Sequence, residues 1–133
     1  MKNISSGKTN KLLILFVIKA VLSTIISIIL FSLVSSKIIL AFDISVDSAK
    51  IFSLAICVLT AAVVSFISVK GFKNNGALLG VICQLPLIFY SLINTIFNNH
   101  NFLLLIIKIV LIALVGAFIG IITVNKSKKI KVK

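Results

Sequence analysis

The sequence predicts an all-α integral membrane protein in which a single domain, residues 1–133, forms a bundle of four membrane-spanning helices. The 133-residue chain is 60% hydrophobic and 12% charged, whereas charged residues make up about a quarter of an ordinary soluble domain. Its apolar residues fall into four long runs, and lysines gather at the ends of those runs. A chain of this composition has too little polar surface for water and is expected in lipid.

The four apolar runs have the length of membrane helices. Each holds about 19 to 25 residues, which at about 1.5 Å per residue crosses a hydrocarbon core of about 30 Å. The runs are continuously apolar and do not alternate, so they do not resemble barrel strands. We predict helices over about residues 12–36, 51–69, 77–97 and 102–124, followed by a basic tail over 125–133.

The first run follows a polar, lysine-bearing arm, residues 1–10, which has no apolar periodicity and is predicted to be mobile. A cleaved signal peptide is the alternative, but the run exceeds the roughly 7 to 15 apolar residues of a signal sequence, and three more runs follow. Lys19 lies about two turns inside this helix. An intramembrane lysine is a functional candidate by default, yet here its stem can reach the lipid headgroups, and we favour that interpretation.

The lysines also predict the orientation of the helices. All 14 basic residues are lysines, and two aspartates leave a net charge of +12. If the turn 70–76 faces the cytoplasm, both termini do so as well. That side then holds 11 of the 14 lysines, and Lys37, Lys50 and Lys108 remain outside, the last by reaching outward from within its helix. This asymmetry is the positive-inside pattern, so both termini are predicted to be cytoplasmic.

A net charge of +12 also raises nucleic acid as a partner. The lysines, however, lie at the edges of apolar runs and form no separate basic domain, so no nucleic acid is expected. Anionic lipid headgroups are the expected partner instead. The tail lysines are the candidates for binding them: Lys126, Lys128, Lys129, Lys131 and Lys133.

The first two helices are joined by the longest connection, residues 37–50, which still contains an apolar pentad, residues 38–42. This pentad either extends the first helix or lies along the membrane interface, and the sequence does not choose between the two. The second helix is expected to end at Gly71, since a glycine there can adopt the left-handed conformation. The second and third helices therefore form a hairpin with a tight turn.

The third helix carries its small and polar residues on one face. Gln84 lies well inside the hydrocarbon, so its amide is expected to find a partner on another helix, a contact worth about 0.6 to 2 kcal/mol. Pro86 removes a backbone donor and is expected to bend the helix. A small cavity beside the bend is possible in principle, but we favour a structural role. The residues on this face are Gly76, Gly80, Gln84, Leu87, Ser91 and Thr95.

Each helix also supplies a pair of small residues four positions apart, a pattern that lets helices pack closely in lipid. Such pairs in all four helices predict a tight bundle. Cys57 and Cys83 are expected at different depths, too far apart for a disulfide, and to serve as small apolar side chains. The candidate helix-packing residues, besides Gln84, are Ser23, Ser27, Ala61, Ser65, Gly76, Gly80, Gly116 and Gly120.

Three stretches of the chain, residues 65–71, 73–80 and 116–125, have a familiar pattern of glycines, a lysine and apolar residues. With the lysine-bearing N-terminus and four spans, they resemble a family of uncharacterised small membrane proteins of Gram-positive, clostridia-type bacteria. The resemblance covers nearly the whole chain. It implies a four-span protein of the bacterial cytoplasmic membrane and carries no established activity or catalytic residues.

The sequence favours a non-enzymatic protein without a cofactor. No histidine, lysine or acid is placed at the depth of a serine to activate it, and no metal-ligand spacing occurs. Our leading hypothesis is a structural or accessory membrane protein that associates with other spans, or with copies of itself, through its small-residue faces. The alternative is a small oligomeric transporter or a holin-like pore. Proton-coupled transport is disfavoured because no acid lies within a span.

Overall fold

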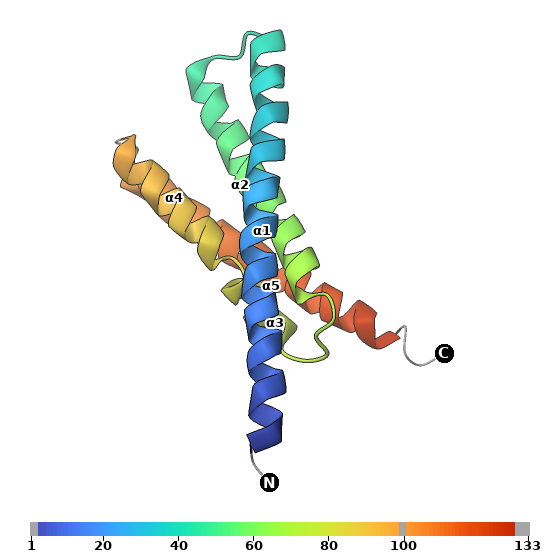
Figure 1. Ribbon diagram of the computed structural model, residues 1–133. Coiled ribbons are helices and arrows are strands. Elements are labelled where there is room, and N and C mark those ends of the chain that lie inside the picture. The colour runs from blue at the N-terminus through green and yellow to red at the C-terminus, as the bar shows by residue number, and fades with distance from the viewer. Residues whose placement is uncertain (1–2, 99–100, 130–133) are drawn as a thin grey trace.

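The computed structural model describes residues 3–98 and 101–129 (Figure 1). Within these residues the chain forms five α-helices and no strand, which confirms the all-α class. The helices are α1 (Asn3–Ala41), α2 (Val46–Val69), α3 (Gly76–Ile82), α4 (Leu85–Phe97) and α5 (Phe102–Lys129).

Four segments of the described chain are long and apolar enough to cross a membrane, with mean hydropathies from 2.0 to 3.0. They are Asn10–Ala41, Asp47–Val69, Gly76–Phe97 and Phe102–Lys126, so α3 and α4 together make one span. Large apolar side chains cover the outside of the molecule along every span. A surface of this kind would associate in water but suits hydrocarbon, as in a multi-pass membrane protein.

The spans are arranged as two helical hairpins that cross near the middle of the molecule (Figure 1). One hairpin is α1 with α2, and the other is α4 with α5; α3 packs on α5 at the crossing, and α2 contacts α1, α3 and α5. The loop at 42–45, the end of α4 and the start of α5 lie at one end, here termed the aspartate end because both aspartates are there (Figure 1). The start of α1, the end of α5 and the turn at 70–75 lie at the other, here termed the lysine end.

The first helix is longer than predicted. It runs from Asn3 to Ala41 instead of 12–36, so the arm predicted to be mobile is helical from Asn3 onward and the pentad 38–42 extends the helix as far as Ala41. The physical reason is cooperativity, since adding a polar residue to an existing helix costs far less than nucleating a new one. The 39 residues of α1 span about 58 Å, nearly twice a hydrocarbon core of about 30 Å. Part of α1 must therefore tilt or project beyond the bilayer.

The bounds of α2 and α5 also differ from the prediction. Helix α2 begins at Val46 instead of residue 51, with Ser45 as its N-cap residue. Asp47 in its first turn accepts a 2.8 Å hydrogen bond from Lys50 Nζ and favourably meets the positive end of the helix dipole. Helix α5 continues to Lys129, so residues 125–129 of the predicted tail are helical, since lysines are good helix formers and are favoured in the last turn.

The third span is interrupted where the bend was predicted, although its backbone stays in the right-handed helical region there. Helix α3 ends at Ile82, α4 begins at Leu85, and Cys83 and Gln84 form a turn between them. Pro86 lies in the first turn of α4, where its missing N–H leaves no helical hydrogen bond unmade. Gly71 follows the end of α2 with φ of +108°, the left-handed conformation expected there.

Candidate functional site

The predicted glycine faces of the third and fourth spans lie against each other where α3 crosses α5. A Cβ atom on Gly76 would lie 2.5 Å from the carbonyl oxygen of Gly120, and one on Gly116 would lie 2.6 Å from that of Gly80. A Cβ atom on Gly80 would lie even closer to the carbonyl oxygen of Gly116, and one on Gly120 even closer to that of Gly76. No side chain fits between these two backbones, so the small residues permit an approach that larger residues would prevent.

Gln84 and Ser65 add hydrogen bonds to this crossing. The amide nitrogen of Gln84 donates to Ala61 O at 2.9 Å and to Ser65 Oγ at 2.8 Å. Ser65 Oγ lies 3.1 Å from the carbonyl oxygen of Gly116, so one hydroxyl links α2 to both α5 and the α3–α4 break. Gln84, Ala61 and Ser65 are completely buried. The amide nitrogen and the Ser65 hydroxyl bond to neighbouring helices, which is a structural role, whereas Gln84 Oε1 is buried without a partner among the described residues.

The remaining packing candidates lie apart from the crossing. Ser23 and Ser27 are buried on α1, whose main neighbour is α2, and Ser23 Oγ donates to Ala20 O within its own helix at 3.1 Å. Among the tail lysines, Lys126 is exposed on α5. Lys128 and Lys129 continue the helix, but their side chains lie outside the described part of the structure, as do Lys131 and Lys133 altogether.

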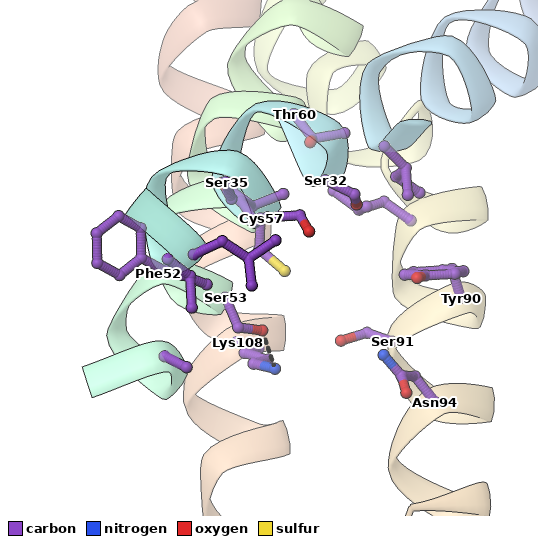
Figure 2. Close-up of a pocket in the computed structure, with 17 residues that line it drawn as sticks. Ser32, Ser35, Phe52, Ser53, Cys57, Thr60, Tyr90, Ser91, Asn94 and Lys108 are labelled. Atoms are coloured by element: carbon purple, nitrogen blue, oxygen red, sulfur yellow. Dashed lines mark hydrogen bonds between the residues drawn. The ribbon is translucent and has the colours of Figure 1, made fainter. Parts of the chain in front are cut away.

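A cleft of about 460 Å³ lies toward the aspartate end, bounded by α1, α2 and α4 and closed on one side by Lys108 of α5 (Figure 2). We term it the Lys108 cleft. Its walls combine apolar side chains with an unusual number of hydroxyls for a membrane interior. The polar residues that line it are Ser32, Ser35, Ser36, Ser53, Thr60, Tyr90, Ser91, Asn94 and Lys108.

The cleft has a buried floor and an exposed rim. Thr60, Leu87 and Ser91 are buried and form the floor. The exposed lining residues come mostly from α1 and α4, so the mouth of the cleft lies between these two helices. Both helices also carry large exposed apolar side chains, so the mouth of the cleft opens onto an apolar surface. The exposed residues of the rim are Ser32, Ser36, Leu40 and Tyr90.

Lys108 is the only charged residue that lines the cleft. Its ammonium donates to Ser53 Oγ at 3.0 Å and is half-buried (Figure 2). The chain has only two side-chain carboxylates, Asp43 and Asp47. Asp47 pairs with Lys50, and within the described residues neither aspartate forms a salt bridge with Lys108. An ammonium has three donors, so Lys108 retains positive charge and donors for a ligand.

Polar groups on the opposite side of the cleft complete the site. Ser91 and Asn94 of α4 face Lys108 across the cavity (Figure 2). The hydroxyl of Thr60, on the floor, is fully buried and has no hydrogen-bond partner among the described residues. A buried polar group left unpaired costs about 1 to 3 kcal/mol, which a ligand accepting this hydrogen bond would recover. The arrangement suits an anionic group flanked by hydroxyls.

Sequence reasoning missed this site. It identified Lys108 as an intramembrane lysine but assigned the ammonium to the headgroup region, whereas the structure places it against Ser53. It did not single out Ser32, Ser53 or Thr60, because hydroxyls from separate helices converge only once the crossing is known. The available signal was a lysine and a serine at similar depth, Lys108 and Ser53, each about 10 Å from the aspartate end of its helix. The expectation that no lysine lies at the depth of a serine is therefore wrong for this pair.

Other chemistry is not evident from the described residues. They contain no group of three or more histidine, cysteine, aspartate or glutamate side chains placed to hold a metal ion. Cys57, which lines the cleft, and Cys83 are both free thiols, as the sequence predicted. Comparison of the chain with protein-family models, with curated proteins and with solved structures finds no match.

Proposed function

We propose that this protein is a non-enzymatic accessory protein of the bacterial cytoplasmic membrane that holds an anionic amphiphile in the Lys108 cleft. The observation that carries the proposal is the half-buried ammonium of Lys108, whose described hydrogen-bond partner is the neutral hydroxyl of Ser53. A lysine at membrane depth is costly and marks a functional site by default. An anion in the cleft would neutralise it.

The shape of the site supports an amphiphile. A cavity of about 460 Å³ is in the range of about 300 to 1,000 Å³ that small-molecule sites occupy, enough for a polar headgroup. Leu40 lies at the rim with 79% of its surface exposed, next to the apolar outer face of α1. The headgroup would sit among the hydroxyls, and the acyl chains would lie along this face in the bilayer.

The proposal differs from the leading hypothesis drawn from the sequence in where it places the accessory role. The glycine pairs and the Ala61–Ser65 pair pack within the molecule, so these surfaces are already occupied and do not offer a partner a docking face. We therefore base the accessory role on the cleft. The proposal keeps the predicted orientation with both termini in the cytoplasm, supported by the lysine distribution, which directs the cleft toward the outer leaflet. The lysines at residues 126–133 would bind anionic headgroups of the inner leaflet.

Lipid retention tests the proposal. The protein would be purified in a mild neutral detergent, and co-purified or added phosphatidylglycerol would be quantified by native mass spectrometry. Lys108→Met should lower retention by about 10- to 100-fold, since a charge-assisted hydrogen bond contributes about 1.5 to 3 kcal/mol. Lys37→Met removes the same charge from α1 near the same end, outside the cleft, and should retain the lipid. Equal retention of the lipid by the unmodified protein, by Lys108→Met and by Lys37→Met would reject the proposal.

A small transporter is the second candidate, favoured by one observation. The third span is broken at Cys83 and Gln84, at the helix crossing. Broken spans frame the substrate sites of many transporters. Reconstituted vesicles would show protein-dependent movement of an anionic lipid between leaflets if this is correct. Leakage of a small soluble dye would instead favour the pore-forming alternative.

A further inference from the structure

A separate pocket of about 190 Å³ lies at the lysine end, between α1 and the turn that follows α2. It shares no lining residue with the Lys108 cleft and does not depend on the function proposed for that cleft. We term it the Lys19–Lys70 pocket. Its lining residues are Leu12, Leu15, Phe16, Lys19, Ser68, Lys70, Gly71 and Phe72.

Two cations from different elements line this one small pocket. Lys19 belongs to α1, whereas Lys70 is the C-cap residue of α2. Both side chains are exposed at the rim of the pocket. The two side-chain carboxylates of the chain, Asp43 and Asp47, are in and next to the loop at the aspartate end. Because both lysines line the same cavity, an anion placed between them is attracted to both.

A buried hydroxyl supplies a second, independent indication of a ligand. Ser68 also lines the pocket and is only 1% exposed. Its Oγ has no hydrogen-bond partner among the described residues. In a membrane-embedded helix a serine hydroxyl is normally satisfied by its own helix, as Thr123 Oγ1 is by Ile119 O at 2.7 Å. The Ser68 hydroxyl is therefore left beside the pocket without an acceptor of its own in the described part of the chain.

The pocket is also held in shape by the turn. Gly71 adopts a left-handed φ of +108°, and Phe72 N–H donates to Val69 O at 3.1 Å. The ring of Phe72 packs edge-on against Phe16 of α1, with centroids 5.4 Å apart. This contact fixes the turn against α1. It thereby fixes the backbone positions of Lys70 and Lys19 relative to each other before any ligand arrives.

We propose that the Lys19–Lys70 pocket binds a phosphate group, with both ammonium groups as cationic partners and the Ser68 hydroxyl as a neutral donor. Phosphate offers several strong acceptor oxygens to separate donors, and lysine is a common partner for it. The pocket lies where two spans reach their lysine-bearing ends. A phospholipid headgroup at the membrane surface and a soluble phosphate ester offer the same chemistry.

The binding test uses the full-length protein in phosphatidylcholine nanodiscs with a minor fraction of phosphatidylglycerol. Lipid bound to the protein would be quantified by native mass spectrometry after release from the disc, with every variant made in a Lys108→Met background so that lipid in the Lys108 cleft does not contribute. Lys19→Gln and Lys70→Gln should each lower phosphatidylglycerol binding at this site at least about tenfold, equivalent to about 1.4 kcal/mol. Ser68→Ala should lower it several-fold without changing the charge.

Matched controls come from the same two elements. Lys11→Gln removes a charge from α1, and Lys73→Gln removes one from the turn; neither residue lines the pocket. Both variants should bind as the parent protein does. Equal losses in pocket and control variants would overturn the proposal, because binding would then reflect total charge. Full binding by Ser68→Ala together with Lys19→Gln would overturn it as well.

Two further measurements complete the test. One distinguishes a lipid headgroup from a soluble phosphate ester, and the other distinguishes the Lys19–Lys70 pocket from the Lys108 cleft. Displacement of the lipid by millimolar glycerol phosphate would support a soluble ester, and retention would support the lipid headgroup. Lys108→Met should leave binding at the Lys19–Lys70 pocket unchanged. A failure of that variant to lose lipid from the Lys108 cleft would therefore count against the proposed function alone, since it does not alter the pocket.

Discussion

Gln84 donates a 2.8 Å hydrogen bond from its amide nitrogen to the hydroxyl of Ser65, and both side chains are completely buried. Gln84 stands at the break between α3 and α4, and Ser65 stands about one turn before the end of α2. Because Ser65 Oγ also lies 3.1 Å from Gly116 O, this pair joins both hairpins at their crossing. In lipid, where hydrophobic burial provides little drive between helices, such contacts and close packing set the arrangement.

Replacing Gln84 should weaken the crossing. Gln84→Leu keeps the volume but removes the donors to Ala61 O and Ser65 Oγ, so the free energy of unfolding should fall by about 0.6 to 2 kcal/mol. Titration with a denaturing detergent in mixed micelles measures this quantity. A double-mutant cycle with Ser65→Ala should show coupling, because the second change removes a bond already lost. Additive effects would contradict the shared hydrogen bond.

Adding one methyl group to the glycine crossing should be destabilising. In Gly116→Ala the new Cβ would meet Gly80 O at 2.6 Å, and overpacking of this kind costs about 1 to 3 kcal/mol. The gain in helix propensity, about 0.5 to 1 kcal/mol, is smaller. Gly7→Ala is the matched control, since nothing lies within 4 Å of its Cβ position. That control should be neutral or slightly stabilising, and a Gly116→Ala protein as stable as the control would disprove the close contact.

Lys108→Met should make the ligand-free protein more stable while it weakens ligand binding. Placing a lysine at the membrane centre costs about 2.5 to 3.5 kcal/mol, and less toward the ends, so removing this charge should yield about 1 kcal/mol. Loss of the bond to Ser53 offsets part of the gain. Titration of the delipidated protein with a denaturing detergent measures whether Lys108→Met raises or lowers the free energy of unfolding. Destabilisation by Lys108→Met would mean that the lysine serves packing instead of a ligand.

The two native cysteines report on the occupancy of the cleft. Cys57 lines the cleft and is half-buried, whereas Cys83 is 1% exposed. A small membrane-permeant maleimide should therefore modify Cys57 first and Cys83 only on unfolding. Adding phosphatidylglycerol should slow the reaction of Cys57 several-fold, and phosphatidylcholine should not. Cys57→Ala should abolish the fast phase, and an unchanged rate with both lipids would show that the cleft stays empty.

Orientation in the membrane can be tested with single cysteines in a background of Cys57→Ala and Cys83→Ala. Lys73→Cys, in the exposed turn at the lysine end, should react with an impermeant maleimide only after the membrane is opened. Asp43→Cys, in the loop at the aspartate end, should react in intact cells. The positive-inside rule supplies the expectation. The reverse pattern would place the Lys108 cleft toward the inner leaflet.

Much of the fold follows from local features of the sequence. Run length alone predicts the four spans, and the positions of Gly71 and Pro86 predict the left-handed residue after α2 and the distortion in the third span. The spacing by three and four on the third span also predicts its inward face, where Gln84 and Ser91 are buried. These features depend on neighbours within one helix, so they are readable without tertiary information.

The rest depends on relations between helices. Hydropathy marks where lipid ends but not where a helix ends, which is why α1 and α5 exceed their predicted ranges. The Lys108 cleft requires the crossing of two hairpins, since Ser53 and Lys108 are 55 positions apart in the chain. No periodic pattern within a single span encodes that meeting.

The interruption in the third span is a point about which α4 could pivot. One end is anchored to α2 through Gln84, and Asn94 lies ten residues further on, about 15 Å away along the helix. A swing of about 5° about that anchor would shift Asn94 by about 1.3 Å, because displacement grows with distance along the rod. Such a pivot would change the width of the mouth of the Lys108 cleft to suit headgroups of different size. The glycine contacts between α3 and α5 would stay as they are.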